Sequence, residues 1–309
     1  MEQKFTSIDQ VMVDLQNRML SQSPAAALDG FEQKKPECPI CNDKGVVIYR
    51  VHYKTEWVED PAFKTLVPVE MVPEADFFAG KVCSPKDAWQ WRDTYSRQCE
   101  CVIRKRIERL MKASEITDEF KKMGFKNFIT KGKPQVIIDA YECALEYFQD
   151  FQEIRHKRQN SIALLGQPGA GKTHLLMAVA NNLMKKLQVS VLYFPYVEGF
   201  SDLKDDFDLL EEKLERMKQV DVLFIDDLFK PVKGKPRATE WQVEQTYSVI
   251  NYRYLNHKPI LISSELTVEE LIEVDEALGT RIFQMCQDYT VVIPRDIKLN
   301  HRLEGLANV

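Results

Sequence analysis

Hydrophobic residues in the second half of the chain gather in five short runs, at 162–165, 189–194, 222–225, 260–263 and 290–293. Uninterrupted apolar runs of about 4–8 residues are typical of strands that are buried on both faces. Spacing typical of helices fills the stretches between them, at 136–154, 172–187, 198–218 and 239–255. This alternation predicts an α/β fold, in which a parallel sheet carries helices on both faces.

The first third of the chain has a different pattern. Residues that favour strands, at 46–51, stand between two pairs of cysteines, and several prolines after them argue against long helices. Helical spacing returns at residue 102 and continues to about residue 123. We therefore expect an N-terminal domain at 1–101, a helical basic linker at 102–133 and an α/β domain at 134–309.

A glycine-rich loop joins the first apolar run to the next helix, with the sequence Gly166-Gln167-Pro168-Gly169-Ala170-Gly171-Lys172-Thr173 followed by His174. Glycines allow backbone amides to approach phosphate oxygens without clashes of a Cβ atom. Lys172 offers a charge to the β- and γ-phosphates, and Thr173 offers a hydroxyl to Mg²⁺ at a helix N-terminus that favours an anion. A glycine-rich turn without a ligand is the alternative. The strand-loop-helix context favours ATP binding by residues 166–174.

Two carboxylates, Asp226 and Asp227, follow the third apolar run directly. The carboxyl end of a parallel strand lies at the edge of the sheet where ligands bind. Asp226 can hold Mg²⁺ through its hydration shell, and Asp227 can orient or deprotonate an attacking water. Adjacent buried carboxylates without a metal would be costly, which favours an ATPase pair over a purely structural one.

With these motifs in place, residues 115–300 resemble the AAA+ ATPases, and more narrowly the DnaC/DnaI-type bacterial helicase loaders and their relative IstB, a transposition helper. The most family-specific piece is Ile250-Asn251-Tyr252-Arg253-Tyr254, followed by Lys258-Pro259-Ile260-Leu261-Ile262-Ser263-Ser264. The resemblance implies an AAA+ P-loop domain with catalytic residues Lys172, Asp226, Asp227 and Arg281. It also implies that a helical lid is lacking, because few residues follow the last strand.

Several positions of this resemblance carry open alternatives. Arg281 occupies the place of an arginine finger that completes a neighbour's site, which implies self-association; the alternative is an arginine on a solvated helix face. Glu265 stands where the family has a sensor-1 asparagine, so sensor 1 is in doubt unless Ser264 substitutes. Arg295 and Arg302 are the candidates for a sensor-2 arginine.

The segment after the second apolar run carries candidates for single-stranded DNA contact. In initiator-type relatives this region touches DNA, and aromatic rings with a cation suit that task, here Tyr196, Phe200 and Lys204. Four aspartates nearby make the segment acidic, and ordinary helix packing is the alternative reading.

Four cysteines form two close pairs, Cys38-Pro39-Ile40-Cys41 and Cys99-Glu100-Cys101. Four thiolates suit a closed structural Zn²⁺ site, and the βαβ context of a redox Cys-x-x-Cys is absent. Cys83 or His52 could replace one ligand, whereas Cys143 and Cys286 lie at apolar positions of helices.

Composition limits the partners. The net charge of −5 argues against a generic polyanion binder, but residues 97–133 hold 11 Lys or Arg against 5 Asp or Glu. The start of the chain lacks the pattern of a signal peptide, and no run is apolar enough for a membrane span, so a cytoplasmic protein is expected.

The resemblance then implies an ATP-dependent loader that delivers a hexameric replicative DNA helicase onto single-stranded DNA. It places the grip on the helicase in the zinc-binding N-terminal domain, where tryptophans are either interface anchors or core residues. The alternatives are an IstB-like transposition helper and an adaptor that binds ATP without hydrolysing it.

Overall fold

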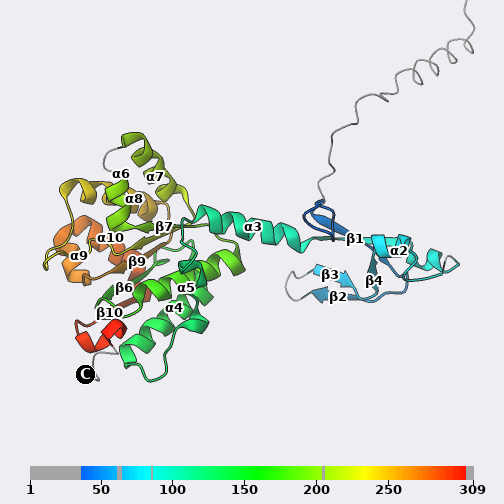
Figure 1. Cartoon of the computed structure of the whole chain (residues 1–309), viewed down its shortest axis with the longest axis horizontal. Coiled ribbons are helices and arrows are strands. Elements are labelled where there is room, and N and C mark those ends of the chain that lie inside the picture. The colour runs from blue at the N-terminus through cyan, green and yellow to red at the C-terminus, as the bar shows by residue number, and fades with distance from the viewer. Residues whose placement is uncertain (1–35, 61–64, 85, 204–205, 304–309) are drawn as a thin grey trace, which may run out of the picture. The chain divides into compact units, whose positions relative to one another are not determined.

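The computed structural model describes residues 36–60, 65–84, 86–203 and 206–303 (Figure 1). Contacts within the chain divide it between Cys99 and Glu100 into two units, which are considered one at a time. In this part of the chain no helix is long and apolar enough to cross a membrane.

The N-terminal unit contains two small antiparallel sheets. One sheet has the order β4-β1-β5, with β1 at Val46–Val51, β4 at Met71–Pro73 and β5 at Asp93–Gln98. The other pairs β2, Trp57–Asp60, with β3, Thr65–Pro68. Short helical turns complete the unit, with α2 at Glu74–Phe78 and the 3₁₀ turn η1 at Ala88–Trp91.

The second unit is built on a five-stranded, fully parallel sheet with the order β10-β6-β9-β8-β7. Its strands are β6, Ile162–Gly166; β7, Val191–Pro195; β8, Val222–Asp226; β9, Ile260–Ser264; and β10, Thr290–Ile293. Each of the five predicted apolar runs therefore forms a strand. The predicted α/β class is confirmed.

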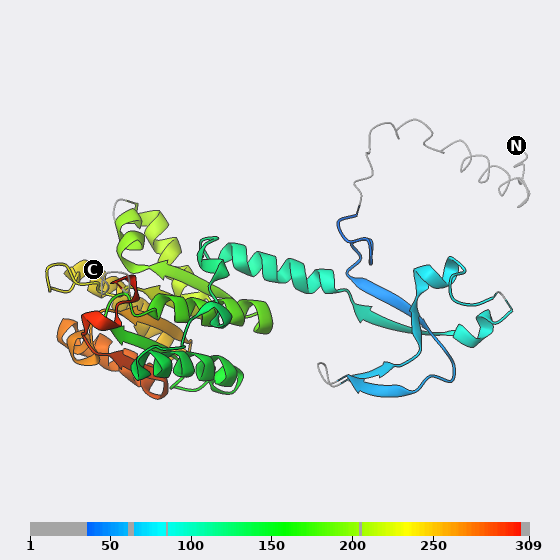
Figure 2. The same ribbon diagram turned by 60° about the horizontal axis from the view of Figure 1, so that its bottom comes forward.

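Helices cover both faces of this sheet (Figure 2). On one face, α4 (Gln135–Ile154) and α5 (Lys172–Leu187) pack against alternate strand residues such as Leu164 and Phe224. On the other face, Leu165 and Ile225 meet the remaining helices, which are α6, Tyr196–Leu203; α7, Phe207–Gln219; α8, Glu240–Leu255; α9, Val268–Val274; and α10, Glu276–Cys286. Burial on both faces explains why the strands read as continuous apolar runs.

The basic linker is helical only in its first part. Helix α3 spans Glu100–Ala113, and the 3₁₀ turns η2 (Phe120–Lys122) and η3 (Phe125–Asn127) replace the predicted continuation to residue 123. The side chain of Asn181 on α5 donates to the carbonyls of Phe120 and Met123, at 2.9 and 2.8 Å. Tertiary contacts thus hold residues 114–133 against the sheet unit.

Two further boundaries differ from the sequence prediction. The single helix expected at 198–218 is two helices, α6 and α7, and Asp206 caps α7 by accepting a hydrogen bond from the amide of Leu209 at 3.0 Å. After β10, the described residues form only the 3₁₀ turns η5 (Ile297–Leu299) and η6 (His301–Leu303). No helical lid is present among them, as predicted.

Candidate functional site

The glycine-rich loop between β6 and α5 requires glycine for steric reasons. Gly166, Gly169 and Gly171 have φ values of 92°, 74° and 89°. A Cβ atom on Gly166 would lie 2.0 Å from the carbonyl oxygen of Ile293, and one on Gly171 would lie 2.7 Å from the ring of Phe128. The loop is therefore a backbone cradle that closes at the N-terminus of α5, where amides and the helix dipole favour an anion.

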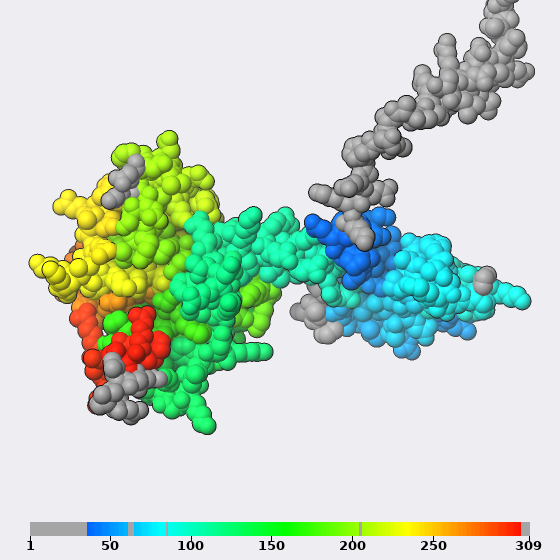
Figure 3. All heavy atoms as spheres, viewed as in Figure 1, coloured from blue at the N-terminus to red at the C-terminus, as the bar shows by residue number. Residues whose placement is uncertain are grey.

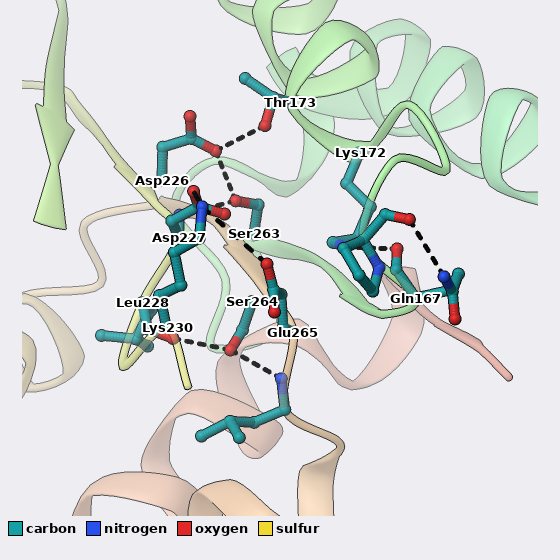
Figure 4. Close-up of polar contacts among 12 residues, drawn as sticks. Gln167, Lys172, Thr173, Asp226, Asp227, Leu228, Lys230, Ser263, Ser264 and Glu265 are labelled. Carbon is teal, nitrogen blue, oxygen red and sulfur yellow. Dashed lines mark hydrogen bonds and ion pairs between the residues drawn. The ribbon is translucent and has the colours of Figure 1, made fainter. Parts of the chain in front are cut away.

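Lys172 lies inside this cradle. Its Nζ donates to the carbonyl oxygens of Gly166 and Gln167, both at 2.7 Å, and the side chain is almost fully buried (Figure 4). Burial lowers the pKa of Lys172 to about 8, although Glu265 and both aspartates act in the opposite direction. A phosphate in the loop would offer this ammonium a charged partner in place of two carbonyls.

Asp226 ends β8 next to the loop and is contacted by three hydroxyls. Thr173 Oγ1 donates to Oδ1 at 2.9 Å, Tyr193 Oη donates to Oδ2 at 3.1 Å, and Ser263 Oγ also donates to Oδ1. Burial raises the pKa of Asp226. The hydroxyl of Thr173 and this carboxylate offer adjacent oxygen ligands, which fits Mg²⁺ binding.

Asp227 begins a tight turn at the edge of the sheet, with φ at 56°. Its amide donates to Ser263 Oγ at 2.8 Å, and its Oδ2 lies 2.6 Å from Nζ of Lys230. The same Nζ lies 3.9 Å from Oε1 of Glu265. Burial lowers the pKa of Lys230, but the hydrogen bond and charge of Asp227, with the charge of Glu265, outweigh it and raise that pKa.

These groups open into one cavity of about 780 Å³. This volume falls in the range typical of small-molecule sites, about 300–1,000 Å³. The cavity is lined by five parts of the chain, which are the loop 168–174, the segment 117–137, the end of β7 with the start of α6, the strand ends with Asp226, Asp227, Lys230 and Glu265, and the C-terminal turns. A polar end at the glycine-rich loop and an apolar wall suit a nucleotide.

Much of the apolar wall comes from the predicted linker, residues 102–133. Phe128 stacks on Tyr141 with centroids 5.8 Å apart and meets the ring of His174 at 5.3 Å. His174 Nε2 is 3.1 Å from the carbonyl oxygen of Gly124. His174 therefore faces the linker segment as well as the cavity. No local signal marks Phe128 for this position, because its role depends on tertiary packing.

The C-terminal turns lie against the loop. The amide of His301 donates to the carbonyl of Gly169 at 3.1 Å, and Arg302 lines the cavity. Arg295 instead forms an ion pair with Glu270 at 2.7 Å. In the space-filling view, these turns, coloured red, lie on the surface of the sheet unit beside green segments (Figure 3). Of the two sensor-2 candidates, the geometry therefore favours Arg302.

The two sensor-1 candidates point in different directions. Ser264 Oγ donates to the carbonyl of Leu228 at 2.7 Å and accepts from the amide of Leu266 at 3.1 Å (Figure 4). Ser264 is thus a buried structural residue. Glu265 is the residue that lines the cavity.

Arg281 on α10 lies apart from the residues that line the cavity. Its guanidinium covers the rings of Tyr247 and Tyr254, at 5.2 and 5.5 Å from their centroids, and donates to the carbonyl of Ala277 at 2.7 Å. An arginine in this place does not serve the site of its own chain.

The proposed DNA contacts take a different form in the structure. Tyr196 and Phe200 are 1% and 2% exposed, and their rings pack edge to face with each other and with Phe229 and Trp241. Neither ring offers a face to a base, so the alternative of helix packing describes both. Lys204 lies outside the described residues.

The four predicted cysteines come together. The Sγ atoms of Cys38, Cys41, Cys99 and Cys101 all lie within 4.8 Å of one another, and all four side chains are buried. Cys38 Sγ and Cys99 Sγ are 3.7 Å apart. Zn–S bonds of about 2.3 Å in a tetrahedron set sulfur atoms about 3.8 Å apart, so the cluster fits Zn²⁺.

The alternative zinc ligands are placed elsewhere. His52 lies 3.2 Å from Oε2 of Glu70 and packs against Trp91 with ring centroids 5.3 Å apart. Cys83 is partly exposed and is not a member of the cluster found among the described residues. Cys143 on α4 and Cys286 on α10 belong to the apolar packing of the sheet unit, and burial raises the pKa of both thiols.

A five-stranded parallel sheet with a glycine cradle after β6 and a carboxylate at the end of β8 defines a P-loop nucleotide-binding protein of the AAA+ class. The chain belongs to the bacterial DnaA ATPase domain family, whose model matches residues 121–286. The predicted resemblance to AAA+ replication ATPases is confirmed at this level.

Relatives extend over more of the chain. "Uncharacterized protein YqaM" of Bacillus subtilis (strain 168) is 59% identical over 96% of this chain and 96% of its own length. "Phage-like element PBSX protein XkdC" of the same organism is 66% identical over 67% of this chain and 79% of its own. Among solved structures, that of DnaI is similar over 58% of this chain and 92% of its own, with 24% identity and a TM-score of 0.47.

Proposed function

We propose that this chain is an ATP-hydrolysing assembly factor that delivers a hexameric replicative helicase onto single-stranded DNA. The observation that carries the nucleotide part is the cavity in which Lys172, Thr173, Asp226 and Asp227 converge from the loop and a strand end. The family match supports a role in replication initiation, and the DnaC/DnaI-like motifs support the helicase as cargo.

Each residue around the cavity has a distinct role in this proposal. The loop 166–173 binds the phosphates through amides and Lys172, and Thr173 and Asp226 hold Mg²⁺, which neutralises phosphate charge when bound. Asp227 accepts a proton from the attacking water or orients it. Its carboxylate is paired with Lys230 at 2.6 Å, so it acts once that ion pair opens.

Arg281 supports hydrolysis across subunits. Its position outside the cavity of its own chain, on α10, suits a finger that reaches a neighbour's nucleotide. Tyr247 and Tyr254 hold its guanidinium in the meantime. Under this proposal, turnover rises with protein concentration because the complete site needs two copies.

Measuring ATP turnover with and without single-stranded DNA tests the enzyme. Asp227→Asn should lower turnover by at least 100-fold while nucleotide binding persists, because general-base contributions are about 10²–10⁴-fold. Asp288→Asn, at an exposed position after α10, is the matched control and should leave turnover unchanged. Binding without turnover in the wild type would favour the adaptor, and stimulation by duplex DNA alone would favour the IstB-like helper.

The N-terminal unit is the proposed grip on the helicase. Large apolar side chains are exposed on it, with Trp57 50% and Leu66 62% exposed on the β2-β3 hairpin. Aromatic residues of this kind anchor protein interfaces. In a pull-down of the purified hexameric helicase by the full chain, Trp57→Ala with Leu66→Ala should weaken capture at least tenfold. Arg281→Ala should leave capture intact. Undiminished capture of the helicase by the variant with Trp57→Ala and Leu66→Ala would contradict the assignment.

A further inference from the structure

Lys230 is one of four lysines that line the cavity, and the motifs of the sequence do not account for it. Its Nζ lies between two carboxylates, 2.6 Å from Asp227 Oδ2 and 3.9 Å from Glu265 Oε1 (Figure 4). Lys172, in contrast, donates to carbonyl oxygens of its own loop. Lys172 is thus the cation of the loop and Lys230 the cation of the strand ends, in a cavity whose lining also includes Lys133, Lys298 and Arg302.

The turn that carries Lys230 is held firmly. Asp227 and Phe229 have φ values of 56° and 51°, in the left-handed region that such side chains rarely adopt. The amide of Leu228 donates to the carbonyl of Ser263 at 2.9 Å, and Leu228 and Phe229 are fully buried. Strained residues of this kind persist where the surroundings fix them, often at functional sites. The backbone therefore fixes where the Lys230 side chain begins, at the rim of the cavity.

Charge explains why a lysine is placed there. Glu198, Asp226, Asp227 and Glu265 bring four carboxylates to a cavity that must accept a polyanion. Glu265 alone would repel a phosphate, because like charges a few ångströms apart are unfavourable. A lysine between Glu265 and Asp227 replaces this repulsion of the phosphate by an attraction. It places an ammonium where the acidic side chain would otherwise face the phosphate.

We propose that Lys230 is a ligand of the terminal phosphate of ATP and that Glu265 is the positioning residue that directs it. The inference rests on the proposed nucleotide function. When a γ-phosphate is present, the Lys230 ammonium turns from Asp227 to that phosphate, and the Asp227 carboxylate becomes free to meet water. ADP lacks this phosphate and leaves the Lys230–Asp227 ion pair closed. Binding of ATP and activation of Asp227 are then one event.

The test is the ratio of the affinities for ATP and ADP, measured with Mg²⁺ by titration calorimetry on the full chain. Lys230→Met should weaken ATP binding by about tenfold or more, the value of one charge-assisted hydrogen bond, and leave ADP binding within about twofold. Glu265→Gln should move the ratio in the same direction by less, and Glu265→Asp should restore it. Lys233→Met, on the exposed part of the same loop, is the matched control.

The outcomes separate this inference from the function on which it rests. A wild-type chain that binds neither nucleotide would overturn both. A wild-type chain that binds ATP, with an unchanged ratio in Lys230→Met, would overturn the role of Lys230 alone. Equal weakening of ATP and ADP would do the same, because a general loss of the pocket does not report on the γ-phosphate. Lys230→Arg keeps the charge and should keep the preference for ATP, which excludes loss of folding as the cause.

Discussion

The two units of this chain bury their side chains in different ways. In the sheet unit, two continuous apolar clusters fill both faces of the five strands. In the N-terminal unit, the described residues that are buried are three cysteines with Val47, Val51 and Pro68. Several of its large side chains, such as Trp57 and Trp89, are half exposed or more.

The difference shows where each unit obtains its stability. A sheet covered on both faces gains its folding free energy from buried apolar area, at about 25 cal/mol per Å². A unit with so few buried apolar residues lacks that source. Small domains of this kind usually depend on disulfides or metals, and no disulfide is formed among the described cysteines. Three cysteines of the cluster, Cys38, Cys41 and Cys99, are then the main part of the core of the N-terminal unit.

The largest expected effect follows from removing that core. Cys99→Ser should abolish zinc binding and unfold the N-terminal unit, because structural zinc contributes roughly 10–16 kcal/mol in zinc-finger peptides. The sheet unit should keep its melting transition and its ATP binding. Zinc content by mass spectrometry, with limited proteolysis of each unit, measures both parts. Cys83→Ser, outside the cluster, is the matched control and should keep one zinc per chain.

The comparison breaks if the N-terminal unit resists proteolysis equally well in Cys99→Ser. That result would mean that the small sheets hold themselves together without a metal. A chelator gives an independent measurement, since it should produce the same proteolytic pattern from the unaltered chain.

The next largest expected effect is on the stability of the sheet unit, which contains a buried cation at an edge of the sheet. The guanidinium of Arg253 on α8 is fully buried and donates to five carbonyl oxygens, those of Met217, Lys218, Val220, Asp221 and Pro259, at 2.6 to 3.2 Å. These carbonyls lie at the end of α7 and the starts of β8 and β9. Arg253 therefore joins three elements at the edge opposite the cavity.

Arg253→Met should lower the free energy of unfolding of the sheet unit by about 3–5 kcal/mol, because it leaves several buried carbonyls without donors. Denaturant unfolding of the full chain measures the loss. Arg237→Met, at an exposed position, should change the same quantity by about 0.5 kcal/mol or less. A small effect at both sites would show that water can enter and replace the guanidinium.

Much of this architecture could be predicted from the sequence, for physical reasons that are local. Strands buried on both faces appear in the sequence as apolar runs. The nucleotide loop is marked by glycines, because its backbone adopts positive φ values that favour glycine. The spacing of the cysteine pairs predicted their cluster. The sequence between Cys41 and Cys99 does not indicate which strands bring the two pairs together. Arg253 lies in the family-specific segment, but its neighbours in the sequence do not indicate its five carbonyl partners.

The parts that could not be predicted depend on tertiary packing. Phe128 reaches the cavity because residues 114–133 pack on α5. The hydrophobic periodicity of the sequence does not predict this packing. Lys230 becomes a cavity residue through a left-handed turn at Asp227. Phe200 illustrates the reverse case, since an aromatic on an amphipathic helix suits a DNA surface and a core equally. The structure places it in the core.

The smallest effect is a pH dependence that acts on the sheet unit alone. Burial lowers the pKa of Lys172 to about 8, against the opposing charges of Glu265, Asp227 and Asp226. A bound phosphate restores its charge and raises that pKa, so the complex keeps a proton that the free chain loses above pH 8. ATP affinity should be constant below about pH 7 and fall by up to tenfold per unit above pH 8. Lys230 does not contribute, because its pKa is raised above the ordinary lysine value.

Calorimetry at pH 9 in two buffers with different ionisation enthalpies should reveal the uptake of nearly one proton per ATP bound, and none at pH 6.5. Lys172→Arg is the informative variant, since a guanidinium stays charged throughout this range. If it still binds ATP, its affinity should not change with pH. An affinity of the wild type that stays level to pH 9.5 would mean that Lys172 is already charged in the free loop, and that its two carbonyl partners stabilise the ammonium fully.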